Sequence, residues 1–165
     1  LYELYNPPIM VIYVGYDKKD IGQPLDGFGF LIPSKEKKNF LGALWSSVIF
    51  DNRAPEGKAA FTIFVGGARS PQIFEKKNDI IIEEVLKEFE KLMKITGKHE
   101  FIKHKFWEHA IPQYNLGYVE HENYFKQFEK NTGIILGGNY IGGISVGDCI
   151  KNSEVLFNKV KERLK

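Results

Sequence analysis

Four apolar, β-rich runs joined by short connections occupy the first part of the chain and limit the folds available to it. The runs cover residues 9–14, 27–32, 40–50 and 59–65. Turn-forming residues end them, including Pro33, the Pro55–Gly57 turn and Gly66. Connections this short favour antiparallel pairing, because parallel neighbours need a long crossover. The sequence therefore predicts an antiparallel sheet as the main layer.

A helix is predicted after the fourth run, because apolar residues recur there at helical spacing. This stripe consists of Ile81, Ile82, Val85, Leu86, Phe89, Leu92 and Met93. Asn78 or Asp79 is placed to cap the start of the helix, and Gly97 to close its end. Residues 101–110 are predicted to be extended again, and residues 118–130 to form a weaker helix.

The C-terminal segment reads as a strand, a glycine-rich turn and a helix. Residues 134–136 are predicted to form a short buried strand. The turn contains Gly137, Gly138, Gly142 and Gly143. Ser145 is placed to cap the next helix, with Asp148 as the acidic partner of a capping box. A helix start behind such a turn suits an electron-rich ligand, although a tight connection without a ligand is the alternative.

The last helix carries apolar residues at helical spacing. They are Val146, Cys149, Ile150, Val155, Leu156, Val160 and Leu164. The order of strands, helix, strand, helix, strand and helix predicts the α+β class. We expect a mainly antiparallel sheet with packing helices, ending in the strand–turn–helix segment.

The composition limits the partners and compartments of the chain without selecting one activity. Cys149 is the single cysteine, so no internal disulfide forms and a reducing, cytoplasmic location is expected. Its place on the apolar helix face predicts a core residue rather than a nucleophile. The four histidines lack a metal-ligand spacing, and no metal site is predicted. The net charge of +2 excludes no partner and favours none, and no nucleic-acid partner is predicted. We see neither a membrane-spanning apolar run nor a signal peptide.

Three of the runs each combine one large apolar side chain with small residues on the same strand face. The large residues are Leu31, Leu44 and Phe64. Their small neighbours on those faces are Gly27 and Gly29, Gly42 and Ser46, and Ala60 and Thr62. Phe28, Phe30, Ile32, Phe61, Ile63 and Val65 alternate with them and are predicted to be core. The small residues either line a cavity for a flat, apolar ligand or let another backbone approach closely.

Five motifs, in this order along the chain, resemble the oxygen-dependent, FAD-containing protoporphyrinogen oxidases of the flavin amine oxidase superfamily. They are Gly27-Phe-Gly-Phe-Leu-Ile-Pro33, Arg53-Ala-Pro-Glu-Gly-Lys58, Phe64-Val-Gly-Gly67, Ala110-Ile-Pro-Gln-Tyr114 and the segment from Gly138-Asn-Tyr to Gly143-Ile-Ser-Val-Gly-Asp-Cys-Ile150. The resemblance extends from about Pro8 to Ile150. It implies an enzyme of heme biosynthesis that oxidises protoporphyrinogen IX to protoporphyrin IX through FAD and oxygen. Some relatives use coproporphyrinogen instead.

The resemblance also implies which residues meet the cofactor and the substrate. The flavin-contacting positions are Trp107, Gly138, Asn139, Ile144, Ser145 and Val146. The porphyrinogen rings would lie against Leu31, Leu44 and Phe64. No side chain is predicted to act as a catalytic acid or base, because the flavin carries the chemistry. A homodimer and peripheral contact with a membrane are compatible with the resemblance.

The chain departs from the family pattern in its missing N-terminal half. It has no βαβ unit with Gly-x-Gly-x-x-Gly to hold the ADP part of FAD. The family's first half would also provide a basic residue for a substrate propionate. We therefore assign residues 1–117 to part of a substrate domain, and residues 118–165 to the C-terminal part of a split FAD-binding domain.

This departure predicts that the isolated chain does not oxidise porphyrinogen and binds FAD poorly. Two other hypotheses stay open at this point. One is a flavin amine oxidase relative with a different substrate. The other is a non-enzymatic tetrapyrrole-binding module that uses the small-residue face without flavin.

Overall fold

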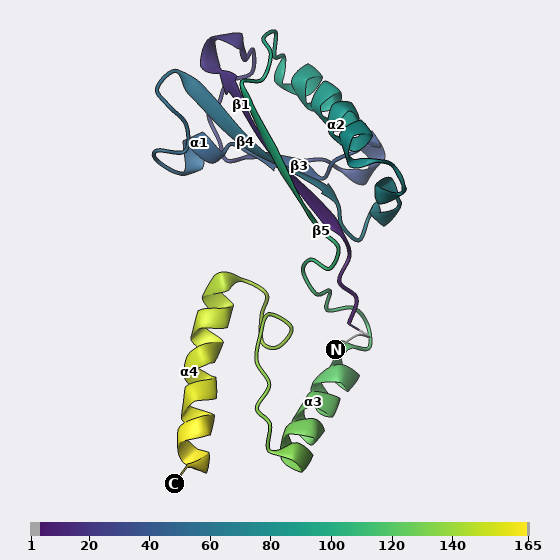
Figure 1. The fold of residues 1–165 in the computed structure, drawn as a ribbon, viewed down its shortest axis with the longest axis vertical. Helices are drawn as coiled ribbons and strands as arrows, with labels where there is room; N and C mark the ends of the chain where they lie inside the picture. Colours follow the sequence, from purple (N-terminus) through teal and green to yellow (C-terminus); the bar gives the residue numbers. More distant parts are fainter. Residues whose placement is uncertain (1–3, 165) are drawn as a thin grey trace. The chain divides into compact units, whose positions relative to one another are not determined.

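A computed structural model describes residues 4–164, which form two compact units. A sheet unit comprises Pro7–Ala110, and a helical unit comprises residues 4–6 and 111–164. Figure 1 shows the order of the elements along the chain. The predicted assignment of residues 1–117 and 118–165 to two functional domains stays a prediction.

The sheet unit is built on five antiparallel strands. They are β1 (Ile9–Asp17), β2 (Gly29–Leu31), β3 (Gly42–Leu44), β4 (Lys58–Gly66) and β5 (Phe101–Trp107). Their order in the sheet is β2-β3-β4-β1-β5, so β4 returns to pair with β1. Short 3-10 turns lie at Lys18–Asp20, Ser34–Glu36 and Pro71–Glu75. The predicted α+β class with an antiparallel sheet is confirmed.

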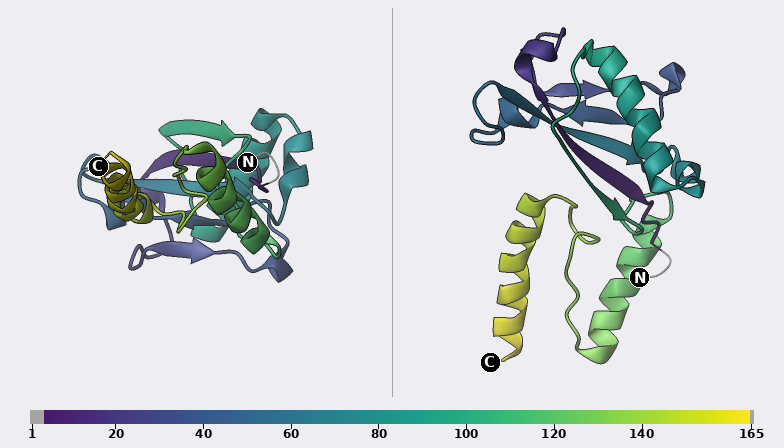
Figure 2. Two further views of the ribbon diagram at one scale, coloured as in Figure 1. Left: turned by 90° about the horizontal axis from the view of Figure 1, so that it is seen from below. Right: turned by 45° about the horizontal axis from the view of Figure 1, so that its top comes forward.

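Helix α2 (Asn78–Met93) covers one face of this sheet, as the right-hand view in Figure 2 shows. Its buried residues are Ile81, Val85, Leu86, Phe89 and Met93, which confirms most of the predicted stripe. They pack against the inward-facing residues of β1 and β4, including Ile12, Phe61 and Ile63. Tyr16 joins the core and donates a hydrogen bond from its hydroxyl to Glu90 at 2.9 Å. Burial raises the pKa of Tyr16 far above its usual value, so it stays a neutral donor.

Two predictions were wrong: the strand at residues 40–50, and the core position of Phe28 in the second run. The run at residues 40–50 is not one strand, because α1 (Ser46–Ile49) follows directly after β3. Trp45 ends the extended segment by accepting hydrogen bonds from the amides of Val48 and Ile49. Phe28 precedes β2 and is 76% exposed rather than core. The alternation of strand faces does not apply to Phe28, because the pairing of β2 with β3 begins only at Gly29.

Both predicted boundaries of α2 were wrong. Lys77 occupies the N-cap position without a side-chain hydrogen bond. At the other end, Lys94 adopts a left-handed conformation with φ +52° and closes the helix. Gly97 has a different role, since a Cβ there would lie 2.0 Å from a carboxylate oxygen of Asp20.

The helical unit contains α3 (Tyr118–Thr132) and α4 (Val146–Arg163), joined by an irregular segment. The predicted strand at residues 134–136 is wrong. These residues pair with no strand of the described chain, and a strand needs a neighbour to satisfy its backbone groups. The apolar stripe of α4 contains no buried residue, and Cys149 is half-buried rather than core.

None of the helices formed by residues 4–164 combines the length and the apolar content needed to cross a membrane.

Candidate functional site

The sheet face opposite α2 brings three predicted site residues together. In the strand register, Leu31 lies opposite Gly42, Gly42 opposite Phe64, and Leu44 opposite Thr62. Opposite residues of antiparallel neighbours project from the same face, so Leu31, Leu44 and Phe64 share it. Leu31 is 83% exposed and Leu44 39% exposed, so they present apolar surface. We call this surface the open face.

Backbone contact explains two of the small residues on the open face. A Cβ on Gly29 would lie 2.0 Å from the carbonyl oxygen of Ala43. A Cβ on Gly42 would lie 2.3 Å from the carbonyl oxygen of Phe30. These two glycines therefore serve the close approach of β2 and β3, which was the alternative to a cavity. Space for a ligand is therefore found at another part of the open face.

That space is a hollow of about 510 Å³ on the open face. Its apolar lining includes Tyr13, Leu44, Phe50 and Phe101, and its polar lining includes Ser46, Thr62, Arg53 and Lys103. The hydroxyls of Ser46 and Thr62 lie 2.7 Å apart and satisfy each other. The hollow thus offers a mainly apolar floor with polar groups around it, the usual character of a small-molecule site.

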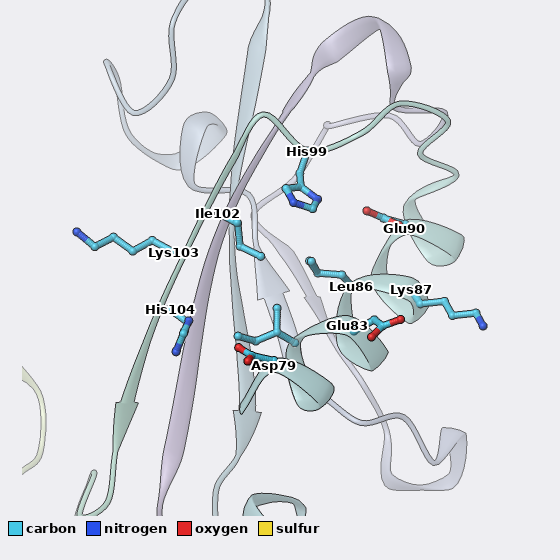
Figure 3. Close-up of a pocket in the computed structure, with 10 residues that line it drawn as sticks. Asp79, Glu83, Leu86, Lys87, Glu90, His99, Ile102, Lys103 and His104 are labelled. Atoms are coloured by element: carbon cyan, nitrogen blue, oxygen red, sulfur yellow. The ribbon is translucent and has the colours of Figure 1, made fainter. Parts of the chain in front are cut away.

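A second hollow, of about 530 Å³, lies between α2 and the β5 segment. Figure 3 shows Asp79, Glu83 and Glu90 on the helix side, facing His99 and His104 from the segment around β5. No group of three metal-ligating side chains occurs within the described part of the chain. None of the predicted site residues lines this hollow.

Three predicted flavin-contacting residues, Ile144, Ser145 and Val146, lie at an open helix start. Ser145 caps α4 as predicted, since its hydroxyl oxygen accepts a hydrogen bond from the Asp148 amide at 3.0 Å. The Ser145 amide donates to the Asp148 carboxylate at 3.2 Å, which completes the capping box. Ile144 is exposed and Val146 is 78% exposed, so side chains of the helical unit do not cover the start.

Tyr114 holds the glycine-rich turn in place, and the sequence patterns did not single it out, although it ends the Ala-Ile-Pro-Gln-Tyr motif. Its hydroxyl donates to the carbonyl of Asn139 at 3.1 Å and accepts from the amide of Gly143 at 3.2 Å. Two ends of the glycine-rich turn are thereby held by one side chain. Only the motif could have pointed to Tyr114. Hydrophobic periodicity does not predict a hydrogen bond from a tyrosine hydroxyl to backbone that is distant in the sequence.

Tyr118 supports the same turn. Its ring stacks on Tyr114 with centroids 4.2 Å apart, and its hydroxyl donates to the carbonyl of Tyr140. The pKa of Tyr118 is raised to about 12, mainly by burial and to a smaller extent by the nearby Tyr114 and Glu122. The phenol therefore stays protonated and able to donate at neutral pH. Together these contacts hold the backbone at Asn139, a predicted flavin-contacting position, and at Tyr140 and Gly143.

We predict that α4 loses its N-terminal cap in acid. Hydrogen bonds from the Ser145 side chain and then its amide hold the pKa of Asp148 below its usual value. A carboxyl with a lowered folded-state pKa stabilises the fold above its unfolded pKa, near 3.9. That contribution disappears as the pH falls through the lower folded value. Carbon chemical shifts of residues 146–150, followed from neutral pH to below about pH 3, should show fraying of the first turn.

Two variants separate the cap from general acid effects. Ser145→Ala removes the side-chain acceptor and should destabilise the helix by about 1 kcal/mol at neutral pH. Asp148→Asn should abolish the acid-dependent step in the shifts. An unchanged titration of the first turn in Asp148→Asn would show that another group causes the acid transition.

Trp107 ends β5 and projects from the open face, like Lys105 on the same strand. It is exposed, and the Lys105 ammonium lies 5.0 Å from its ring centroid. Trp107 belongs to the sheet unit, whereas Gly138, Asn139 and Ile144–Val146 belong to the helical unit. The structure therefore groups the predicted flavin contacts within two separate units, and their role stays a prediction.

Comparison with known families identifies the family of the chain. Residues 1–153 match the family described as flavin containing amine oxidoreductase. The match covers most of the chain, which therefore belongs to this family. Within it, the chain is similar to protoporphyrinogen oxidases.

Two plant enzymes illustrate that similarity. The chain is 32% identical over 149 residues to "Protoporphyrinogen oxidase, mitochondrial" of Nicotiana tabacum, covering 88% of this chain and 30% of that protein. It is 32% identical over 152 residues to "Protoporphyrinogen oxidase 2, chloroplastic/mitochondrial" of Arabidopsis thaliana, covering 90% and 30%. The chain thus spans about 30% of the length of these curated relatives.

A solved structure shows the same fold. It is a protein from Exiguobacterium sp. 255-15 with a provisional protoporphyrinogen oxidase name. Its TM-score is 0.80 at 16% identity, and the match covers 98% of this chain and 36% of that one. At this identity the likeness concerns the fold.

Proposed function

We propose that this chain supplies the substrate face and the flavin-facing turn of an FAD-dependent protoporphyrinogen oxidase. The reaction would convert protoporphyrinogen IX to protoporphyrin IX, with oxygen as the electron acceptor. The observation that carries the proposal is the shared exposed face of Leu31, Leu44 and Phe64. Strand alternation and the family resemblance predict the same three residues from the sequence.

The open face suits the tetrapyrrole side of this reaction. Leu31 and Leu44 offer exposed apolar surface to a flat macrocycle. Phe64 lies on the same face, where it pairs with Gly42 of the neighbouring strand. Burying that surface against a ligand is favourable by about 25 cal/mol per Å² of apolar area. Apolar packing also excludes water from the reacting carbon and nitrogen atoms. The role of these residues is to bind and orient the substrate.

The start of α4 suits a flavin ring on two observations. It is exposed, with Ile144, Ser145 and Val146 all open to approach. The capping box occupies the amides of Ser145 and Asp148, whereas no hydrogen bond is found within residues 4–164 for those of Val146 and Gly147. Free amides at a helix N-terminus stabilise negative charge, such as that on a reduced flavin ring. When bound, FAD would accept hydride equivalents from substrate and pass electrons to oxygen.

Several finer assignments belong to this proposal. The choice between protoporphyrinogen and coproporphyrinogen, a homodimer and peripheral membrane contact are predictions. A cytoplasmic location is also a prediction, while the names of the two plant relatives place those proteins in mitochondria or chloroplasts. The competing functions are an oxidase of amines, which the peroxide assay below separates from this proposal, and a tetrapyrrole-binding module without flavin.

Porphyrin binding tests the open face directly. We expect deuteroporphyrin IX, a stable planar analogue, to bind the chain without FAD, measured by the fluorescence anisotropy of the porphyrin. Leu44→Asp places a charge on the apolar surface and should weaken binding about tenfold, equivalent to about 1.4 kcal/mol. Leu92→Asp is the matched control, because Leu92 is 37% exposed but lies on α2 rather than the open face. Equal effects of the two substitutions would contradict the assignment of the face.

A flavin titration tests the cofactor side. We expect the isolated chain to bind FAD poorly and to form no fluorescent protoporphyrin from protoporphyrinogen IX. Micromolar FAD affinity with turnover would overturn the view that the remaining cofactor contacts lie in polypeptide outside these residues. Peroxide release from simple amines would favour the amine oxidase alternative.

A further inference from the structure

We propose that Arg53 and Lys103 form a carboxylate-binding subsite at the rim of the open-face hollow and thereby set the orientation of an acidic tetrapyrrole. This inference rests on the proposed function and adds a recognition element to it. The ligand class is a planar, apolar molecule with a carboxylate at one edge.

Both cations are placed at the same hollow by different elements. Arg53 lies in the connection between α1 and β4, and Lys103 lies on β5. The Arg53 guanidinium carbon lies 5.3 Å from the ring centroid of Phe50, so this contact holds the side chain over the lining of the hollow. Lys103 pairs with Tyr13 in the sheet and borders both hollows. Figure 3, a close-up of the second hollow, shows its side chain extending away from α2.

The hollow has no negative charge of its own. Its lining contains no aspartate or glutamate. Lys58, by contrast, is held by Asp17 at 3.0 Å and by Glu100 at 2.6 Å. Within residues 4–164, neither Arg53 nor Lys103 forms an ion pair with a carboxylate inside 4.0 Å. Two cations without partners beside an apolar floor are complementary to an anionic, amphipathic ligand.

The subsite gives a direction to the bound macrocycle. Leu44 lines the hollow together with both cations, so the apolar rings can contact Leu44 while a carboxylate reaches the rim. The guanidinium fork of Arg53 matches a carboxylate in geometry, and the ammonium of Lys103 adds a point charge. Leu31 and Phe64 lie on the same face outside this lining, so the carboxyl-bearing edge would point away from them.

The test compares one ligand with and without its carboxylates. Deuteroporphyrin IX and its dimethyl ester are titrated into the full chain at the same detergent concentration, with porphyrin anisotropy as the readout. We expect the acid to bind more tightly than the ester. Arg53→Gln and Lys103→Gln should each weaken binding of the acid about fivefold, the scale of about 1 kcal/mol for an exposed charge pair. Neither substitution should change binding of the ester, and added salt should weaken binding of the acid alone.

Lys105→Gln is the matched control. Lys105 lies on the same strand and face as Lys103, but it sits over Trp107 and does not line the hollow. Its substitution should leave both affinities unchanged. Equal weakening by Lys105→Gln and Lys103→Gln would overturn the subsite in favour of diffuse positive charge.

The outcomes distinguish this inference from the function on which it rests. If Leu44→Asp weakens both ligands while Arg53→Gln and Lys103→Gln leave the acid unchanged, the subsite is wrong and the open face stands. If Leu44→Asp has no effect on either ligand, or neither ligand binds, both proposals fail.

Discussion

Phe89→Ala should lower the free energy of unfolding of the sheet unit by about 3–5 kcal/mol, the range for deleting a buried phenylalanine ring. Phe89 is fully buried between α2 and the sheet. Its ring lies 5.1 Å from that of Phe61 and 6.4 Å from those of Phe30 and Phe40, measured between centroids. Removing the ring leaves a cavity that these rigid neighbours cannot fill. Urea denaturation followed by tryptophan fluorescence measures the change.

The fluorescence reports on the correct unit, because Trp45 and Trp107 both lie in the sheet unit. Phe28→Ala is the matched control. It deletes the same ring at a site that is 76% exposed, so the expected loss is below about 1 kcal/mol. A loss at Phe89 no larger than that at Phe28 would contradict the described core.

Gly29→Ala should destabilise the sheet unit by about 2 kcal/mol or more and loosen β2. Gly29 has φ +136°, a conformation that alanine rarely adopts. The added Cβ would also lie 2.0 Å from the carbonyl oxygen of Ala43, which is backbone and cannot rotate away. The expected signs are a lower urea midpoint and faster exchange of the Trp45 amide, which donates to the carbonyl of Phe28 at 2.9 Å.

The same substitution at Gly57 separates the clash from the backbone strain. Gly57 has φ +75°, but a Cβ there would meet no atom within 4 Å. Gly57→Ala should therefore cost only the left-handed penalty, about 1 kcal/mol. Equal losses at the two glycines would show that β2 and β3 do not approach each other as described. Because β2 carries Leu31, loosening it should also weaken porphyrin binding.

The sequence was informative where one local pattern controls the structure. Period-two alternation on the fourth run predicted the buried Phe61, Ile63 and Val65, because a strand has only two faces. The spacing of Ser145 and Asp148 predicted the capping box, since it is made within one helical turn. Both features depend on residues that are near one another in the chain.

Local patterns failed where partners come from elsewhere in the molecule. Residues 134–136 look like a buried strand but pair with none of the described strands, because β propensity does not supply a neighbour. Phe28 alternates correctly with Phe30 yet is exposed, because the pairing of β2 begins only at Gly29.

The sequence by itself determined the antiparallel α+β class, the apolar faces of β4 and α2, and the cap of α4. Only the tertiary structure decided the strand order β2-β3-β4-β1-β5, which places Leu31, Leu44 and Phe64 on one face and brings Lys103 and Arg53 to one hollow. It also decided that Tyr114 holds the turn at Asn139 and Gly143. The physical reason is range: alternation and capping act between near neighbours, whereas strand order and side-chain clamps join residues that the sequence keeps far apart.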